Sequence, residues 1–311
     1  MPLDVDMERV LNALAARGFR TLDQFSIQRL RALSAQLRVP DHATVRIERR
    51  EMPGPGGVLQ LTIYRPLESA GWPGALVFFP AGGYVLSAAP GHSALCGALS
   101  VGGECVVVSV QHRLAPEQRF PAAVDDAYAA TCWIHEQADE LMIDHERIAI
   151  GGHSSGATLA TAVARLAKER RNPPLIYQLL LEPLCDLRTH SLWTAAPDTH
   201  AGILSADNLR WLAGNYVASA EQLEDPRCSP ITSKNLIGLP TALIASAEFD
   251  PLREQTEAYV AALRLAHVDV TTRVYPGVTH GFLGMHTFVE RGRLALADCQ
   301  AALRRALAAR A

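Results

Sequence analysis

The chain has 311 residues, of which 49% are hydrophobic and 20% are charged, and its formal net charge is -3. A chain of this length can form one large domain or two small ones. The near-neutral charge, without a basic stripe, argues against a general nucleic-acid binder, because phosphate binding requires clustered positive charge. The longest apolar runs, such as 75–79 and 179–181, fall far short of the roughly 18 residues that a membrane helix needs.

Two further features indicate the compartment. The first six residues have neither the basic region nor the apolar region of a secretory signal. The six cysteines are scattered without a C-x-x-C pair, so neither a zinc knuckle nor a disulfide framework is indicated. We therefore expect a cytoplasmic protein of enzyme size that has no membrane-inserted segment.

The first 40 residues predict helices, because their apolar residues recur at intervals of three or four. One set precedes Gly18 and the other follows it: Met7, Val10, Leu11 and Leu14, then Phe25, Ile27, Leu30, Leu33 and Leu37. Strand character follows at 44–49 and 58–64, and a Pro-Gly-Pro-Gly-Gly turn at 53–57 separates the two segments.

Beyond residue 74, short apolar runs alternate with longer helical patterns. The predicted helices include 121–137 and 158–170. The predicted strands are 75–79, 105–110, 148–150, 176–181, 242–245 and 268–274. Fully apolar runs that alternate with helices are typical of a mostly parallel sheet that is covered on both faces.

Residues 185 to about 236 interrupt this alternation as an insertion rich in Trp, Asp and Pro. Its Trp193, Trp211 and Tyr216 fit the core of a small subdomain. They fit equally well the lining of an apolar pocket over an active site. The sequence leaves both interpretations open.

A Gly-His-Ser-Ser-Gly sequence at 152–156 follows the predicted strand 148–150 and opens a helix. G-x-S-x-G in a sharp strand-to-helix turn is the nucleophile elbow, in which the turn exposes the serine hydroxyl. The helix N-terminus also favours negative charge that develops at Ser154. For this motif taken alone, a plain turn of small residues is the alternative.

A serine nucleophile needs a base, and the base needs a carboxylate that orients it. Asp250 and His280 each lie just past a predicted strand, in the order serine, acid, histidine that the elbow predicts. Open α/β sheets bind their ligands at such strand ends. We therefore expect Ser154, Asp250 and His280 to form a triad. If Asp250 did not orient the histidine, another carboxylate such as Asp186 or Glu248 would have to do so.

The transition state of acyl transfer also needs hydrogen-bond donors aimed at the carbonyl oxygen. The sequence Pro80-Ala81-Gly82-Gly83-Tyr84 follows the predicted strand 75–79, where a backbone loop with this role is expected. Adjacent glycines allow peptide N–H groups to approach a substrate closely. A plain Gly-Gly turn is the alternative interpretation.

Other ligand motifs fail at single positions. A dinucleotide loop that starts at Gly151 would need glycine in place of His153, and no Lys-Ser or Lys-Thr follows to complete a phosphate loop. His135-Glu136 and His145-Glu146 could each begin a zinc-binding H-E-x-x-H motif, but neither is followed by the second histidine. We expect no metal site and no cofactor.

Four sequence blocks together resemble the hormone-sensitive-lipase-like branch of the α/β-hydrolases, a group of bacterial carboxylesterases. The blocks are Gly82-Gly83-Tyr84, then 113–117 with 120–126, then the elbow around Ser154, and last Asp250-Pro251-Leu252-Arg253 with His280-Gly281-Phe282. The resemblance implies an α/β-hydrolase fold, in which helices flank a mostly parallel eight-stranded sheet and a helical cap covers it.

The resemblance also implies a role for each matching residue. Ser154 would be the nucleophile, His280 the base and then the acid, and Asp250 the residue that holds the imidazole. The N–H groups of Gly82, Gly83 and Ser155 would donate hydrogen bonds to the oxyanion.

In terms of domains, the resemblance implies that residues 1–311 form a single α/β-hydrolase domain. The catalytic core would comprise about 41–184 and 237–311, and the cap would comprise 1–40 and about 185–236.

The chain departs from the family pattern at several positions. Gln111-His112 stands where Asp-Tyr is common, and Gln118 replaces a usual His. Pro80-Ala81 stands where His-Gly is usual, and His153 and Ser155 replace the usual Asp and Ala. We predict a serine carboxylesterase that hydrolyses small esters of short-to-medium acyl length through an acyl-enzyme. An acyltransferase or dedicated tailoring enzyme with the same triad is one alternative, and a non-catalytic binding protein on this fold is another. The expected partner is a small-molecule ester, and a homodimer stays open.

Overall fold

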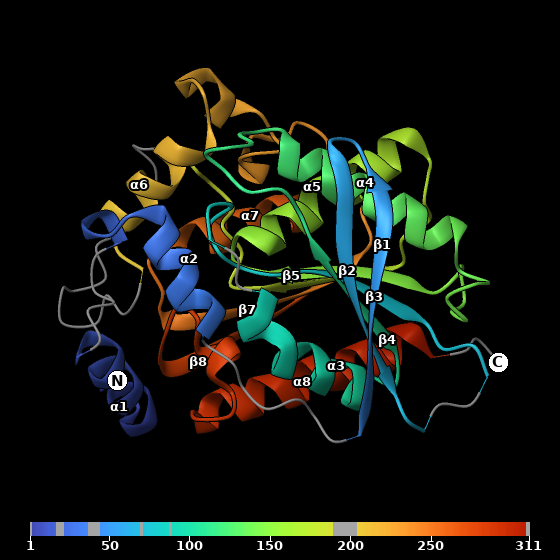
Figure 1. Ribbon diagram of the computed structural model, residues 1–311, viewed down its shortest axis with the longest axis horizontal. Coiled ribbons are helices and arrows are strands. Elements are labelled where there is room, and N and C mark those ends of the chain that lie inside the picture. The colour runs from blue at the N-terminus through green and yellow to red at the C-terminus, as the bar shows by residue number, and fades with distance from the viewer. Residues whose placement is uncertain are drawn as a thin grey trace.

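The computed structural model describes residues 2–16, 22–36, 44–68, 71–86, 89–188 and 204–308, with an eight-stranded sheet at its centre (Figure 1). The strands are β1 (Val45–Gly54), β2 (Gly57–Pro66), β3 (Ala75–Phe79), β4 (Val106–Gln111), β5 (Ile148–His153), β6 (Tyr177–Leu181), β7 (Thr241–Phe249) and β8 (Val270–Thr279). Their order across the sheet is β1-β2-β4-β3-β5-β6-β7-β8. β2 pairs antiparallel with both β1 and β4, and every later pair is parallel. The prediction of a mostly parallel, eight-stranded sheet is confirmed.

Helices cover both faces of this sheet. They are α1 (Val5–Ala16), α2 (Ile27–Gln36), α3 (Ser93–Gly103), α4 (Ala122–Glu136), α5 (Ser155–Arg170), α6 (Ala206–Tyr216), α7 (Arg253–Leu265) and α8 (Glu290–Leu307), with short 3₁₀ turns that include η2 (Ala89–His92) and η6 (Phe282–Met285). α3 and α8 pack against one face, and α4, α5 and α7 pack against the other (Figure 1). Among the described helices, none is both long and apolar enough to span a membrane.

The side chains of β3 show how the sheet separates two hydrophobic cores. Val77 and Phe79 belong to the core under α4 and α5, whereas Leu76 and Phe78 belong to the core under α3 and α8. All four side chains are fully buried. Because successive side chains of a strand point to opposite faces, a strand covered on both faces must be apolar throughout. This is the physical origin of the unbroken apolar run at 75–79.

Several elements extend beyond their predicted bounds. α5 begins at Ser155 rather than at 158, because small residues are tolerated in a first turn whose N–H groups have no partner within the helix. β7 continues to Phe249 and β8 to Thr279. β8 tolerates Pro276 because it is an edge strand, where a missing N–H leaves no neighbouring strand unpaired. The longer strands carry Asp250 and His280 to the same edge of the sheet.

The N-terminal helices pack against the rest of the chain, as their apolar spacing predicts. Ahead of α1, the N–H of Asp4 donates to the carbonyl of Gly277 in β8 at 2.7 Å. In α2, the guanidinium of Arg31 donates to the carbonyl of Val85 at 2.9 Å. The predicted helix break at Gly18 lies outside the described residues.

Gly156 fixes the distance between α5 and the end of β3. A Cβ atom added at this glycine would lie 1.9 Å from the carbonyl oxygen of Phe79, so Gly156→Ala must push helix and strand apart. We expect the substitution to lower the free energy of unfolding, measured in urea, by about 2 kcal/mol or more.

Gly214→Ala in α6 is the matched control for this prediction. A Cβ at Gly214 meets nothing within 4 Å. Alanine is the better helix former, so this variant should gain up to about 1 kcal/mol in stability. Equal stabilities of the two variants would contradict the close packing of Gly156.

Candidate active site

Ser154 occupies the sharp turn between β5 and α5. Its backbone has φ 56° and ψ -121°, a conformation that residues other than glycine rarely adopt. The turn is tied to the sheet, because the N–H of Ser154 donates to the carbonyl of Leu181 at 2.8 Å. This geometry is that of the nucleophile elbow, in which a strained backbone holds the serine hydroxyl at the end of the sheet.

His280 connects Ser154 with Asp250. Its Nε2 lies 3.0 Å from the Oγ of Ser154, and its Nδ1 lies 2.8 Å from Oδ2 of Asp250. Asp250 is held in turn by the N–H of Leu252, which donates to Oδ1 at 2.8 Å. All three side chains are buried, where hydrogen bonds meet little competition from water. The structure thus places the three residues predicted from the sequence in one hydrogen-bonded row.

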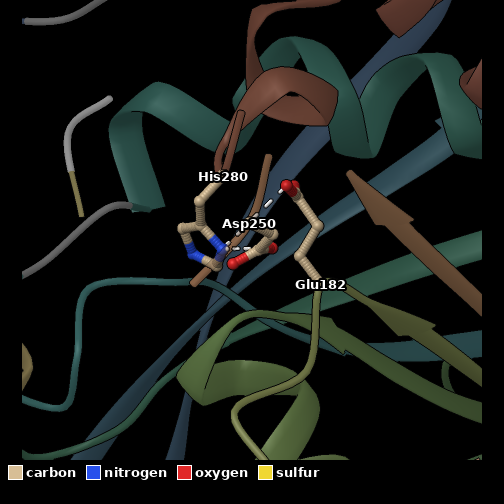
Figure 2. A group of neighbouring side chains, drawn as sticks. All are labelled: Glu182, Asp250 and His280. Carbon is tan, nitrogen blue, oxygen red and sulfur yellow. Dashed lines mark hydrogen bonds and ion pairs between the residues drawn. The ribbon is translucent and has the colours of Figure 1, made fainter. Parts of the chain in front are cut away.

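A second carboxylate, that of Glu182, also faces His280 (Figure 2). Its Oε1 lies 4.0 Å from Nδ1 of His280, and the oxygen of Asp250 lies 2.8 Å from the same nitrogen. Burial alone would lower the pKa of His280, but the two carboxylates outweigh it, Asp250 more than Glu182, and raise the pKa to about 9. The protonated imidazole is therefore stabilised here.

Glu182 belongs to a buried chain of polar side chains. Its Oε2 lies 2.8 Å from Nε2 of His153, and Nδ1 of His153 lies 2.8 Å from Nε2 of His92. Burial, and then the neighbouring charge of His280, lower the pKa of His153 to about 3, so this ring is neutral. A neutral ring suits both neighbours when its Nε2–H donates to Glu182 and His92 donates to its Nδ1.

Among the described residues, one group of three side chains has the composition of a metal site. It consists of Glu182, Asp250 and His280, whose ligand atoms lie within 4.8 Å of one another. These atoms already have partners: Nδ1 of His280 bonds Asp250, and Oε1 of Glu182 accepts from the N–H of Gly281 at 2.9 Å. A cation would compete with the Nδ1 proton, so the group suits hydrogen bonding better than metal binding.

The loop after β3 bends at the two glycines that follow Pro80-Ala81. The φ angle is 133° at Gly82 and 60° at Gly83, and it is also positive, at 65°, in Tyr84, which the sequence did not indicate. The N–H of Gly83 donates to the Oγ of Ser155 at 2.9 Å. One donor of the loop therefore points at the first residue of α5, next to Ser154.

Helix α6 contacts this loop. The ring of Tyr216 stacks on that of Tyr84, with ring centroids 3.7 Å apart. The side chain of Leu212 lies so close to Gly83 that a Cβ added to the glycine would be 2.5 Å from Cδ2 of the leucine. A segment of the predicted insertion thus lies directly against the loop beside Ser154.

The aromatic residues of the insertion have different surroundings. Tyr216 is fully buried and Trp211 is partly buried in the same hydrophobic core, whereas Trp193 lies outside the described residues. Tyr216 is therefore a core residue, and the core that it joins is the one under α4 and α5. A cavity of about 490 Å³ lies elsewhere, between β1, α4 and α5, and Ser154 and His280 do not line it.

The fold and the geometry of Ser154 define the class of protein. A family model described as alpha/beta hydrolase fold matches residues 76–284, a range that includes the loop after β3 and all three members of the hydrogen-bonded row. The chain belongs to the α/β-hydrolase family. Within that family it falls in the hormone-sensitive-lipase-like branch of carboxylesterases, as the four sequence blocks predicted.

Individual relatives are consistent with this assignment. The carboxylic ester hydrolase LipN of Mycobacterium tuberculosis is 38% identical over 242 residues, which cover 75% of this chain and 63% of that protein. An ethyl acetate hydrolase of Pseudomonas putida is 36% identical over 241 residues, covering 76% of this chain and 74% of that one. The crystal structure of a thermostable esterase from Pseudomonas putida matches with a TM-score of 0.92 and 32% identity over 99% of both chains.

The other carboxylates considered from the sequence have different partners. Asp186 forms an ion pair with Arg188 at 2.8 Å. Glu248 accepts a hydrogen bond from the N–H of Gly277 at 2.8 Å. The second carboxylate that the structure places beside the histidine is Glu182, which the sequence analysis did not name.

The sequence did contain a signal for Glu182. This residue directly follows the strand 176–181, as Asp250 and His280 follow theirs. No comparable signal marked His92 or the hydroxyl of Ser155, because their contacts come from loops and from a helix start whose approach depends on the tertiary structure.

Gly83→Ala tests whether the loop conformation matters for turnover. Alanine at φ 60° is strained by about 1 to 2 kcal/mol, and its Cβ would clash with Leu212. We expect kcat for p-nitrophenyl acetate to fall by roughly tenfold or more. Adding Leu212→Ala should recover part of the loss, since it removes the clash and leaves the strain.

Ser155→Ala is the matched comparison. It removes the hydroxyl that accepts from Gly83 but keeps the backbone N–H of residue 155. We expect turnover to stay within about tenfold of the parent, because an oxyanion donor at this position is a backbone group. A loss of a hundredfold or more would instead place the hydroxyl itself in the reaction.

Proposed function

We propose that this chain hydrolyses carboxylic esters through an acyl-enzyme formed on Ser154. The observation that carries the proposal is the row of hydrogen bonds from Ser154 through His280 to Asp250, at 3.0 and 2.8 Å, in a member of a carboxylesterase branch. A nucleophile within hydrogen-bond reach of a base, which a third group orients, is the arrangement that acyl transfer requires.

In the first half of the reaction, Oγ of Ser154 attacks the ester carbonyl while its proton moves to Nε2 of His280. The carbonyl electrons move onto the oxygen, and the backbone N–H groups of Gly82, Gly83 and Ser155 stabilise the negative charge. The N–H of Gly83, which donates to Oγ of Ser155 at 2.9 Å in the free protein, turns to the oxyanion in this step. The tetrahedral intermediate then expels the alcohol, which takes the proton from Nε2. The acyl group remains on Ser154 as an ester.

In the second half, a water molecule repeats these steps on the acyl-enzyme. Its proton moves to Nε2 of His280 as its oxygen attacks the acyl carbonyl. Oγ of Ser154 then leaves and regains that proton, and the acid product is released. Protein groups supply the nucleophile, the base and the oxyanion donors, so the reaction calls for no cofactor.

The substrate we propose is a small, fairly apolar ester of short-to-medium acyl length. Apolar side chains of α6 lie against the loop beside Ser154, Leu212 among them, which favours a compact apolar binding site. A relative named ethyl acetate hydrolase also supports small acyl groups.

The assignment of residues 1–40 and about 185–236 as the cap is also part of this proposal. It is supported by a hydrogen bond between the two segments, in which the N–H of Leu22 donates to Oδ1 of Asn208 at 3.0 Å.

The acyltransferase alternative gains no support from the altered residue His153. Its ring is buried and bonded to Glu182 and His92, so it is not a group that would bind an acceptor alcohol.

A cytoplasmic location is also part of the proposal and is supported by six free cysteines. For the homodimer that the sequence left open, sedimentation equilibrium is the direct measurement.

Ser154→Ala should abolish ester hydrolysis. We expect kcat to fall by about 10⁴ or more, because removing the nucleophile ends acyl-enzyme formation. A fluorophosphonate probe should add one phosphonyl mass to the parent chain and none to the variant, as measured by intact-protein mass spectrometry. Turnover of the variant within tenfold of the parent, or labelling of the variant, would contradict Ser154 as the nucleophile. A parent chain that is neither labelled nor active would favour a binding protein.

Asp250→Asn should lower kcat by roughly 10³ to 10⁴, because asparagine holds the imidazole in the wrong tautomer. Combining it with Ser154→Ala should add almost nothing to the loss from Ser154→Ala alone, since members of one catalytic unit are not additive. Steady-state kinetics of the two single variants and the double variant check this. Multiplying losses would mean that the two residues act separately.

A further inference from the structure

Glu182 is a fully buried carboxylate that the reaction proposed above does not use. We propose that Glu182 is a positioning residue, which holds the loop of His280 in place and strengthens this histidine as a base through its negative charge. The inference rests on the proposed function, because it concerns the base of that reaction. It adds a fourth residue to the row formed by Ser154, His280 and Asp250.

The contacts of Glu182 match this role. Oε1 accepts the N–H of Gly281 at 2.9 Å and lies 4.0 Å from Nδ1 of His280. Figure 2 shows Glu182 and Asp250 converging on this nitrogen from two different strand ends. One carboxylate oxygen thus contacts the backbone just after the imidazole and also lies within reach of its charge.

This carboxylate is ionised over the pH range in which His280 loses its proton, because the pKa of Glu182 lies below that of His280. Burial raises the pKa of Glu182 to about 7, while the charge of His280 and the N–H groups of Gly281 and Leu283 lower it. The Nε2–H of neutral His153 donates a hydrogen bond to the other carboxylate oxygen, Oε2 of Glu182, at 2.8 Å. An aspartate at position 153, the usual family residue, would place a second negative charge against Glu182. A neutral histidine at position 153 avoids this repulsion, which explains why His153 and Glu182 occur together in this chain.

The charged and titratable groups around His280 come from every neighbouring strand end. Asp250 follows β7, Glu182 follows β6, and the ring of His153 at the end of β5 stacks on the imidazole with centroids 6.0 Å apart. His92 lies behind His153, and Glu248 is bonded to the backbone of β8. Of these, the two carboxylates Asp250 and Glu182 raise the basicity of His280.

The consequence is a pH profile displaced to higher pH. Protonated His280 cannot accept the proton of Ser154, so kcat/KM must rise as this imidazole loses its proton. A second nearby anion delays that loss and also makes the neutral imidazole a stronger base. Removing the charge of Glu182 should therefore move the acid limb to lower pH and reduce the plateau at high pH.

Glu182→Gln removes the charge and keeps the shape. Its amide oxygen can still accept from Gly281, and its NH₂ group can donate to Nε2 of His153 once the neutral His153–His92 pair exchanges tautomers. We expect the midpoint of the acid limb of kcat/KM to fall by about one pH unit or more, because an opposite charge within about 4 to 6 Å shifts a pKa by that amount. Glu182→Asp retains the charge one methylene further away and should shift the midpoint in the same direction by less.

Glu248→Gln is the matched control. It also removes a carboxylate that accepts a backbone N–H, but the donor is Gly277 within β8 rather than Gly281 beyond its end. Its midpoint should stay at the parent value. A merely structural role for Glu182 would lower kcat/KM by the same factor at every pH and lower the thermal unfolding temperature, with the midpoint unchanged, and that result would overturn the proposal.

A second readout does not depend on turnover. In the Ser154→Ala background, the imidazole of His280 can be titrated by NMR with labelled histidine, with and without Glu182→Gln. A lower pKa in the double variant supports the inference, and equal values overturn it. Failure of the proposed function would appear separately, as unchanged turnover in Ser154→Ala alone.

Discussion

Parallel strands that end side by side are the constraint on which this site depends. β5, β6, β7 and β8 are neighbours in that order, and their carboxyl ends therefore lie along one edge of the sheet. The residue that directly follows each strand is, in turn, Ser154, Glu182, Asp250 and His280. Residues up to 126 positions apart in the sequence thus meet within hydrogen-bond distance. The pairing of the strands sets the positions of all four residues.

The same edge has to accommodate two buried carboxylates beside one imidazole. Burying charge is costly unless each charge is paired and hydrogen-bonded. Here Asp250 bonds His280 and the backbone of Leu252, while Glu182 bonds His153 and the backbone of Gly281. Each carboxylate is therefore held by one ring and by backbone N–H groups. The N–H groups of Leu252 and Gly281 stabilise the two carboxylate charges, so no additional cationic side chain is needed.

The departures from the family pattern become understandable in this setting. Pro80-Ala81 is compatible with the loop because the positive φ angles fall on the following residues, where glycine tolerates them. His153 carries no charge into a region that already holds two carboxylates, and it links Glu182 to His92. Ser155 gives the N–H of Gly83 an acceptor at 2.9 Å. These exchanges alter the surroundings of the row from Ser154 to Asp250 and leave its members in place.

Much of this protein was determined by its sequence alone. The unbroken apolar run of β3 and the alternation with helices specified a parallel sheet, because periodicity and burial are local properties. The G-x-S-x-G turn, together with Asp250 and His280 just past later strands, predicted the three residues that the structure joins by hydrogen bonds. Tertiary structure alone decided which further groups surround that row. Glu182 follows a predicted strand, but its bond to His153, like the bonds of His92 and of the Ser155 hydroxyl, joins residues at least 29 positions apart. Such contacts depend on strand order and on the approach of separate loops, which no local pattern encodes.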